Sequence, residues 1–489
     1  MPSISLPWLH HTLPHVRGLD TSRYGSRKLR AERQADNARQ RAADALDLAL
    51  CIGELIAGNG ASAEETVAAI LVIADAYGLE GCESDVTLNA VELTGHAAGD
   101  AVPLMGKRII QHHTTDFATL ENTQLLVQAI HDGTLSLAEA RKAAAELIPE
   151  PERPGALRPW KRRYTGHALV GLIAAAASVL TGAKLGVALC ALLAAVTGNW
   201  ISSSLARYGV PAFYRFTLAA IPAAAVALVV HALWPGVASQ SIIIAGVLVL
   251  LPTMAATSAV QDSLAGHYLT AVARLLETLT IFASVVLGTG LVLGLATRLG
   301  LDVPTLPSVR ATSGAYLDWR LVAAALFAVG IAARYKVAPR KWAAVGLLGL
   351  AGVLVYAELR ELGFSPITAT GIAAVAVAVG GHFLSRRART SALPWVIPAA
   401  APLLPGTLIY KALYAVTNGE VLEGATGMVR ALGVILALAG GISVVGETVQ
   451  FLRRWRAVRA AVRADTAADA AQPPADAVVV ASETTTVRG

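Results

Sequence analysis

The feature that most constrains this chain is a succession of apolar runs between residues 166 and 452. A helix needs about 20 apolar residues to cross the hydrocarbon core of a bilayer. Only 15% of the residues are charged, against about 25% in soluble domains. The sequence therefore predicts a polytopic α-helical membrane protein of about ten transmembrane helices. The ten predicted spans are 166–182, 185–201, 213–234, 241–260, 275–297, 320–334, 342–358, 367–385, 393–413 and 430–452.

The basic residues test the direction of these spans, because Lys and Arg gather on the cytoplasmic side of membrane proteins. If residue 1 is cytoplasmic and the ten spans alternate, the inner segments hold 18 Lys and Arg residues and the outer segments hold 7. An error of one span would place later basic clusters, such as Arg386 and Arg387, on the outer side. We therefore expect a multi-pass protein of the cell membrane with both termini in the cytoplasm. The net charge of +6 then needs no nucleic-acid partner.

Leu-Leu-Pro occurs twice inside the apolar runs, at 250–252 in the fourth span and 403–405 in the ninth. A proline in a helix interior removes a hydrogen bond and clashes with the preceding turn. The equivalent breaks are five spans apart, which suggests two halves, 166–297 and 320–452, joined by an outer loop, 298–319. Because five is odd, the second half enters the membrane in the opposite direction. We expect two inverted five-helix repeats, a common plan of secondary transporters.

Interrupted helices at matching positions of two such repeats point to the substrate site. The freed backbone groups must face protein or water, because lipid cannot satisfy them. Helix ends can hold the carboxylate and the ammonium of a zwitterion. The alternative is that each proline makes a simple kink packed by neighbouring helices. We expect a polar substrate pocket between the halves, lined by Pro252, Thr257, Gln261, Asp262, Pro405, Thr407, Tyr410 and Lys411.

Other polar residues lie near the predicted inner ends of the spans. Arg274 and Glu277 are three residues apart, so they share one helix face and can pair. This pair is interpreted either as a structural ion pair or as a gate or coupling-ion site. Asn199, followed by serines at 202–204, could line the same mouth. His231 and His382 are interpreted as ordinary interfacial residues.

Residues 1–165 carry many charges and are typical of a soluble segment. Ser62 and Glu65 have the spacing of a helix capping box, in which each side chain caps the backbone of the other. We expect a cytoplasmic α+β domain at 41–148, with helices at 42–58, 63–78, 120–131 and 136–147 and strands at 85–93 and 103–112. Around it we expect a disordered segment at 1–40, a linker at 149–165, and a basic flank with a disordered tail at 453–489.

Catalytic and metal-binding motifs are not apparent in this domain. Glu54, Glu64, Glu65, Asp85, His112 and His113 match no ligand spacing, and no Walker loop indicates ATP-driven pumping. The three cysteines, Cys51, Cys82 and Cys190, are interpreted as buried small hydrophobic residues. We expect no enzyme activity, no metal and no cofactor.

Three stretches carry a family resemblance: 53–66 followed by 85–89, then 260–277, then 402–410. In these stretches the chain resembles the threonine/serine exporter family. The resemblance implies a cytoplasmic N-terminal domain followed by ten spans. It also implies export of threonine and serine driven by the proton motive force, with split relatives linked to dicarboxylate export. It assigns no substrate residues, so the predicted site depends on the physical argument alone.

We therefore expect a secondary exporter of small hydrophilic amino acids, threonine and serine, working in a lipid bilayer by exchange with protons. Three alternatives stay open: an exporter of small dicarboxylates such as succinate, a membrane-anchored hydrolase with its active site in 42–148, and a passive channel. The sequence leaves a homo-oligomer open.

Overall fold

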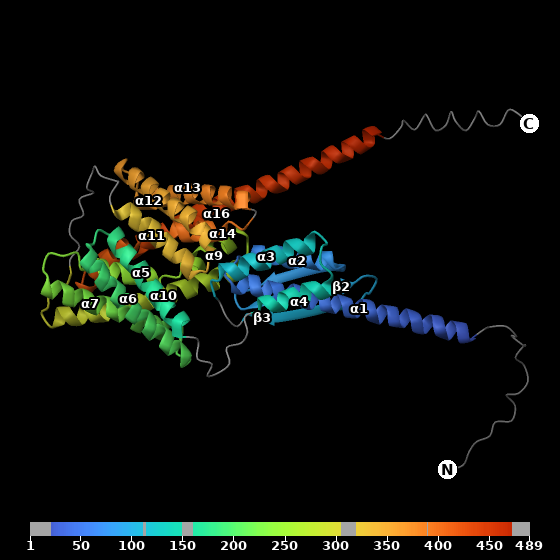
Figure 1. Ribbon diagram of the computed structural model, residues 1–489, viewed down its shortest axis with the longest axis horizontal. Coiled ribbons are helices and arrows are strands. Elements are labelled where there is room, and N and C mark those ends of the chain that lie inside the picture. The colour runs from blue at the N-terminus through green and yellow to red at the C-terminus, as the bar shows by residue number, and fades with distance from the viewer. Residues whose placement is uncertain (1–20, 111–113, 149–159, 305–318, 389, 472–489) are drawn as a thin grey trace, which may run out of the picture.

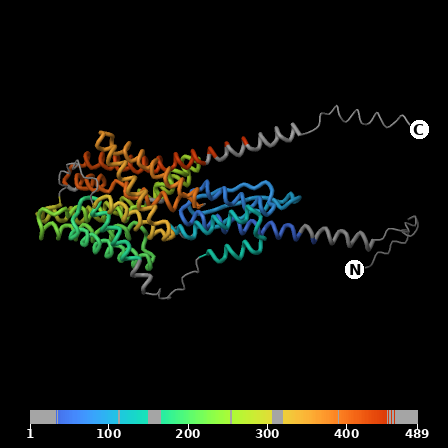
Figure 2. Tube along the Cα trace, turned by 45° about the horizontal axis from the view of Figure 1, so that its top comes forward, coloured from blue at the N-terminus to red at the C-terminus, as the bar shows by residue number. Residues whose placement is uncertain are grey.

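The computed structural model describes residues 21–110, 114–148, 160–304, 319–388 and 390–471. It contains an N-terminal domain of α1–α4 and β1–β3, and a helical part of α5–α16 that lies beside it (Figure 1). Figure 2, turned by 45°, shows the domain at the same end of the helical part. The α1 and α16 helices both project on the side of this domain.

In the N-terminal domain α1 and α2 pack on a three-stranded antiparallel sheet of order β1-β2-β3, and α3 and α4 pack on these two helices and on each other. A Cβ at Gly106 would lie 2.5 Å from Leu46 and Leu50, so the absence of a side chain lets α1 rest directly on β3. The elements are α1 (Thr21–Gly58), α2 (Ala63–Ala76), β1 (Leu79–Val86), β2 (Ala90–Ala97), β3 (Pro103–Ile109), α3 (Phe117–His131) and α4 (Leu137–Leu147).

Two local predictions for this domain are wrong. The expected single strand at 85–93 is the end of β1, a turn and the start of β2, with the Thr87 N–H donating to the Ala90 carbonyl at 2.9 Å. Alternation of apolar residues continues through both arms of a hairpin, so period two alone does not reveal the reversal. Disorder through residue 40 is also wrong, since α1 already begins at Thr21.

Each predicted span coincides with a helix or a bent helix pair. The helices are α5 (Trp160–Leu180), α6 (Leu185–Arg207), α7 (Ala212–Leu233), α8 (Gln240–Leu250), α9 (Thr253–Leu264), α10 (Tyr268–Arg298), α11 (Trp319–Arg334), η1 (Pro339–Lys341), α12 (Trp342–Glu361), α13 (Pro366–Ala388), α14 (Leu393–Ala400), η2 (Ala401–Leu403), α15 (Gly406–Thr417) and α16 (Val421–Ala471). The last helix continues to Ala471, through part of the segment expected to be a flank and disordered tail.

By length and composition, six described helices can cross a membrane: α6, α7, α10, α12 with η1, α13 and α16. The bent pairs α8–α9 and α14–α15 raise the number to eight. The apolar part of α5, Gly166–Leu180, is shorter, and α11 has 16 residues. The protein is therefore a mostly helical multi-pass membrane protein with six to eight candidate spans.

Both Leu-Leu-Pro stretches break their helices with the same local geometry. Leu251 and Leu404 are extended, with ψ of 133° and 142°, as expected for a residue that precedes proline. Pro252 and Pro405 are the N-cap residues of the next helix, each with φ of −83°. The helix axes bend by 50° at the first break and by 42° at the second.

The helices α5–α10 and α11–α16 pack in the same pattern. In the first set α8 contacts α5, α6 and α7, and in the second α14 contacts α11, α12 and α13. The α7–α10 and α13–α16 contacts also correspond, and both contain a close crossing at glycine. A Cβ at Gly288 would lie 2.1 Å from the Thr217 carbonyl oxygen, and one at Gly441 would lie 2.6 Å from that of Gly371.

The helices α7 and α13 meet the N-terminal domain with opposite ends. The start of α7, at Arg215, shares a cavity with Gly60, whereas the end of α13, at Ser385, shares a cavity with Ser62. Likewise Thr270, near the start of α10, donates to the Val86 carbonyl at 2.9 Å.

The N-terminal domain contacts both sets of helices. On the first set, the Ser258 hydroxyl donates to the Gly60 carbonyl at 3.1 Å. On the second, the Phe117 N–H donates to the Tyr335 carbonyl at 2.9 Å, and Lys341 Nζ lies 2.8 Å from Glu121 Oε2. The domain therefore bridges the two sets at one end of the helical part.

Candidate functional site

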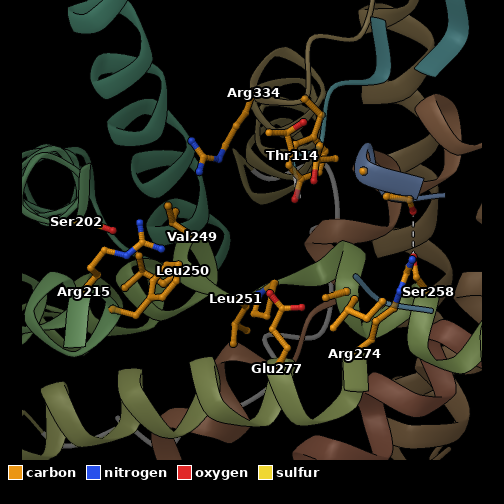
Figure 3. A pocket seen from close by; sticks show the side chains of 18 of the residues that line it. Thr114, Ser202, Arg215, Val249, Leu250, Leu251, Ser258, Arg274, Glu277 and Arg334 are labelled. Atoms are coloured by element: carbon orange, nitrogen blue, oxygen red, sulfur yellow. Dashed lines mark hydrogen bonds between the residues drawn. The ribbon is translucent and has the colours of Figure 1, made fainter. Parts of the chain in front are cut away.

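A cavity of about 520 Å³ lies where the N-terminal domain meets the break between α8 and α9 (Figure 3). Its walls come from that break, from α6, α7, α10 and α11, and from loops of the domain. We call it the central cavity. Its lining includes Gly58, Gly60, Thr114, Asn199, Ser202, Arg215, Leu251, Pro252, Ser258, Arg274, Glu277 and Arg334.

Three charged side chains face this space. Figure 3 shows Arg215, Arg334 and Glu277 directed toward a common region beside Leu251. The Nε of Arg215 is buried and has no hydrogen-bond partner among the described residues. A guanidinium group presents a planar fork of donors that matches a carboxylate. The cavity can therefore bind an anion at its arginines and a cation at the Glu277 carboxylate.

Arg274 also reaches the cavity wall, but it is paired with Asp262. Arg274 Nε lies 3.2 Å from Asp262 Oδ2, close enough for an ion pair but not aligned as a hydrogen bond. Both side chains are buried. The expectation that Arg274 pairs with Glu277 is wrong about the partner, because the carboxylate that forms the ion pair with Arg274 is that of Asp262, near the end of α9.

This buried pair holds a loop of the N-terminal domain. The other Asp262 oxygen accepts the Ala63 N–H at 2.7 Å, and Arg274 Nη2 donates to the Ala61 carbonyl at 3.0 Å. Asp262 and Arg274 are therefore docking residues in this structure, and only Arg274 lines the central cavity.

The second break does not line the central cavity. A Cβ at Gly406 would lie 2.7 Å from Leu248, so the start of α15 packs against α8. Tyr410 is fully buried and donates to the Pro304 carbonyl at 2.6 Å. Lys411 is exposed, Thr407 is half-buried and Pro405 is buried. The four residues predicted near this break do not line the central cavity, because the start of α15 packs against α8 instead.

The residues predicted near the first break are divided between different places. Pro252 lines the central cavity, whereas Thr257 is buried within the helical part. Asn199 lines the central cavity, and its Nδ2 lies 2.6 Å from His167 Nδ1. Gln261 instead lines a second, smaller cavity.

This second cavity, of about 190 Å³, lies between the start of α2 and the helices α13, α14 and α16. It contains His382, which we had interpreted as an ordinary interfacial residue. Its polar lining comprises Ser62, Glu64, Glu65, Gln261, His382, Ser385, Thr390, Ser391, Ser443 and Glu447. Among the described residues, no group of three or more His, Cys, Asp or Glu side chains is placed to hold a metal ion.

Sequence reasoning missed Arg215 and Arg334 as site residues, because both served only as basic residues that set the topology. A signal was available for Arg215, which is the third residue of the predicted span 213–234. An ionisable residue within a span is costly and marks a functional site by default. The sequence carried no comparable signal for Gly58, Gly60 or Thr114, which reach the cavity from the N-terminal domain.

Comparison with known proteins places these features in a family. A family model described as "Putative threonine/serine exporter" matches residues 47–296, and a second, described as "Threonine/Serine exporter, ThrE", matches residues 320–447. The threonine/serine exporter of Corynebacterium glutamicum is 29% identical over 418 residues, covering 83% of this chain and 82% of the relative. The "Probable threonine/serine exporter" of Mycobacterium tuberculosis is 28% identical, covering 85% of this chain and 78% of the relative. No solved structure matches the chain. The chain belongs to the threonine/serine exporter family.

Proposed function

We propose that this protein is a secondary exporter of threonine and serine that exchanges them for protons, and that the central cavity is its substrate site. One observation carries the proposal: the buried Nε of Arg215, which has no hydrogen-bond partner in the part of the chain that the structure describes, lies in a cavity that also contains the Glu277 carboxylate, beside a broken helix. A cavity of about 520 Å³ is within the usual range for small-molecule sites. The names of the relatives agree with an amino-acid substrate.

The polar groups of the cavity match a small hydroxy amino acid. Arg215 and Arg334 would bind the α-carboxylate, because charge-assisted hydrogen bonds to guanidinium are strong. Glu277 would accept the α-ammonium group. The side-chain hydroxyl would bind Asn199 or Ser202, which line the wall formed by α6.

The arrangement of the helices supports alternating access. The matched contacts of α5–α10 and α11–α16, and the opposite ends with which α7 and α13 meet the N-terminal domain, support an inverted repeat. We propose ten spans in two inverted five-span halves, with α8–α9 and α14–α15 each making one broken span. The 18-to-7 distribution of basic residues supports a cytoplasmic location for both termini and the N-terminal domain.

A dicarboxylate fits the cavity less well, because a second carboxylate would meet the like charge of Glu277. Hydrolysis in the N-terminal domain is also disfavoured, since Glu54 and Asp47 both pair with Arg108, at 3.2 and 2.9 Å. We therefore propose a transporter without enzyme activity. A passive channel would differ in one measurement, because its flux would not depend on a proton gradient.

The test is counterflow of labelled threonine, serine and succinate in proteoliposomes. Arg215→Gln removes a charge-assisted hydrogen bond worth about 1.5–3 kcal/mol, so threonine affinity should fall about 10- to 150-fold. Glu277→Gln should lower the affinity for threonine and raise the affinity for succinate relative to that for threonine. Arg207→Gln is the matched control, because Arg207 is exposed at the end of α6 and its guanidinium binds Ser203 and Ser204 outside the cavity. Equal threonine affinity in all four proteins would reject this substrate site.

A further inference from the structure

The N-terminal domain contains two helix starts of the pattern Ser-x-x-Glu, and only one forms a complete capping box. At α4, Glu139 Oε2 accepts both the Ser136 N–H at 2.9 Å and the Ser136 hydroxyl at 2.7 Å. At α2, the Ser62 hydroxyl accepts the Glu65 N–H at 3.2 Å, but the Glu65 carboxylate does not return to Ser62. The predicted box at Ser62 and Glu65 is therefore half formed, and the Glu65 carboxyl is directed elsewhere.

The Glu65 side chain lines the second cavity, at the interface between the domain and the membrane helices. Its Oε2 is buried and has no hydrogen-bond partner among the described residues. Four other elements bring ionisable groups near it. These groups are Asp262 on α9, which is paired with Arg274 on α10, His382 on α13 and Glu447 on α16. Glu64 lies beside Glu65 on α2 itself.

These surroundings disfavour the charged form of Glu65. Burial raises the pKa of its carboxyl from 4.5 to about 7, and the nearby charges of Glu64 and Asp262 add to this effect. Glu139 gives the opposite result within the same domain, because the hydrogen bonds from Ser136 lower the pKa of its carboxyl. The complete capping box favours the carboxylate, whereas the half-formed box favours the acid near neutral pH.

The pKa of Glu65 links proton binding to docking of the domain. If the domain separates from the helices, the start of α2 meets water and the carboxyl returns to its ordinary pKa near 4.5. Below this pH both states hold the proton, so docking is unaffected. Between about 4.5 and 7 the separated state loses its proton first, so docking weakens as pH rises, by roughly two to three powers of ten in total.

We propose that Glu65 is a proton-binding site at the interface between the N-terminal domain and the membrane helices, and that the domain docks with this proton bound and separates when it leaves. The docked domain covers the central cavity, since Gly58 and Gly60 form part of its wall. Proton release from Glu65 therefore opens the cavity toward the domain side. Only this last consequence depends on the proposed transport function.

Docking can be measured without transport, by the distance between spin labels at Lys142→Cys on α4 and Tyr208→Cys at the end of α6. Both positions are exposed, and neither lines the two cavities. The full chain, with its three native cysteines replaced by alanine, would be studied in lipid nanodiscs without substrate between pH 5.5 and 8.5. We expect a short distance at low pH and a second, longer distance whose population grows as the pH rises toward 7 and levels off above it.

Three variants decide the assignment. Glu65→Gln should keep the short distance at every pH, because its amide mimics the protonated acid. Glu64→Gln should keep the transition but lower its midpoint, since one of the charges that raises the pKa of Glu65 is removed. Glu139→Gln is the matched control and should show the same pH transition as the parent protein.

A distance that does not change with pH, or a Glu65→Gln protein that titrates like the parent, would overturn the proposal. The counterflow assay then separates the two proposals. A pH-dependent distance in a protein that transports no amino acid would reject the transport function and leave the Glu65 site standing. Amino-acid transport by a protein whose label distance does not change with pH would reject the Glu65 site and leave the transport function standing.

Discussion

Asp262→Asn should release the N-terminal domain, and the size of the effect follows from the burial of the pair. Asp262 has an exposed fraction of 0% and Arg274 of 6%, so water screens their interaction little. Removing one partner of a buried ion pair costs about 3–5 kcal/mol, because the other charge stays buried and unpaired. The amide introduced by the substitution could still accept the Ala63 N–H, so the loss is mainly that of the charge. The undocked fraction should rise about 150- to 5,000-fold.

Chemical labelling can measure this fraction. Ala61 has an exposed fraction of 0%, and its carbonyl accepts a bond from Arg274. A cysteine at position 61 would therefore react with a maleimide only when the domain separates, at a rate proportional to the undocked fraction. Asp132→Asn is the matched control, since Asp132 is an exposed residue at the end of α3 in the same domain.

The double variant Asp262→Asn with Arg274→Met tests the cause. Replacing both members of a buried pair by uncharged residues is often nearly neutral, so the double variant should label much more slowly than Asp262→Asn alone. Labelling of Asp262→Asn at the parent rate would show that the buried ion pair does not hold the domain. So would a double variant whose labelling rate is the product of two independent effects.

Two further predictions concern the membrane helices. Pro252→Ala should lower the counterflow rate more than Pro405→Ala at matched expression, since only the first break lines the central cavity; equal losses would contradict this. Gly288→Ala should cost about 1–3 kcal/mol of stability, because its new Cβ would lie 2.1 Å from the Thr217 carbonyl oxygen. Thermal unfolding in detergent would measure the loss, with Gly294→Ala on the same helix as control, where nothing lies within 4 Å; similar unfolding temperatures in both would count against the close crossing.

The features that depend on local chemistry could be predicted from the residues alone. The apolar runs predict membrane helices, because helices of this length and composition are stable in the hydrocarbon core of a bilayer. Each Leu-Leu-Pro stretch predicts a broken helix, because proline forbids the helical hydrogen bond and extends the residue before it. Both breaks are present, at Leu251 and at Leu404, with nearly the same backbone angles. The family was also visible in short motifs spread along the chain.

Which polar groups meet depends instead on how the elements pack in three dimensions. Asp262 accepts the N–H of Ala63, at a helix start 199 residues away in the chain, and Arg274 pairs with Asp262 rather than with Glu277. The same docking leaves Glu65 outside a capping box that its spacing predicts, while Ser136 and Glu139 complete theirs. Spacing along a chain fixes neighbours within a helix, but the burial of a charge depends on every element that packs around it. For this reason the broken helices could be predicted from the sequence, whereas the residues that face the cavities beside them depend on the tertiary packing.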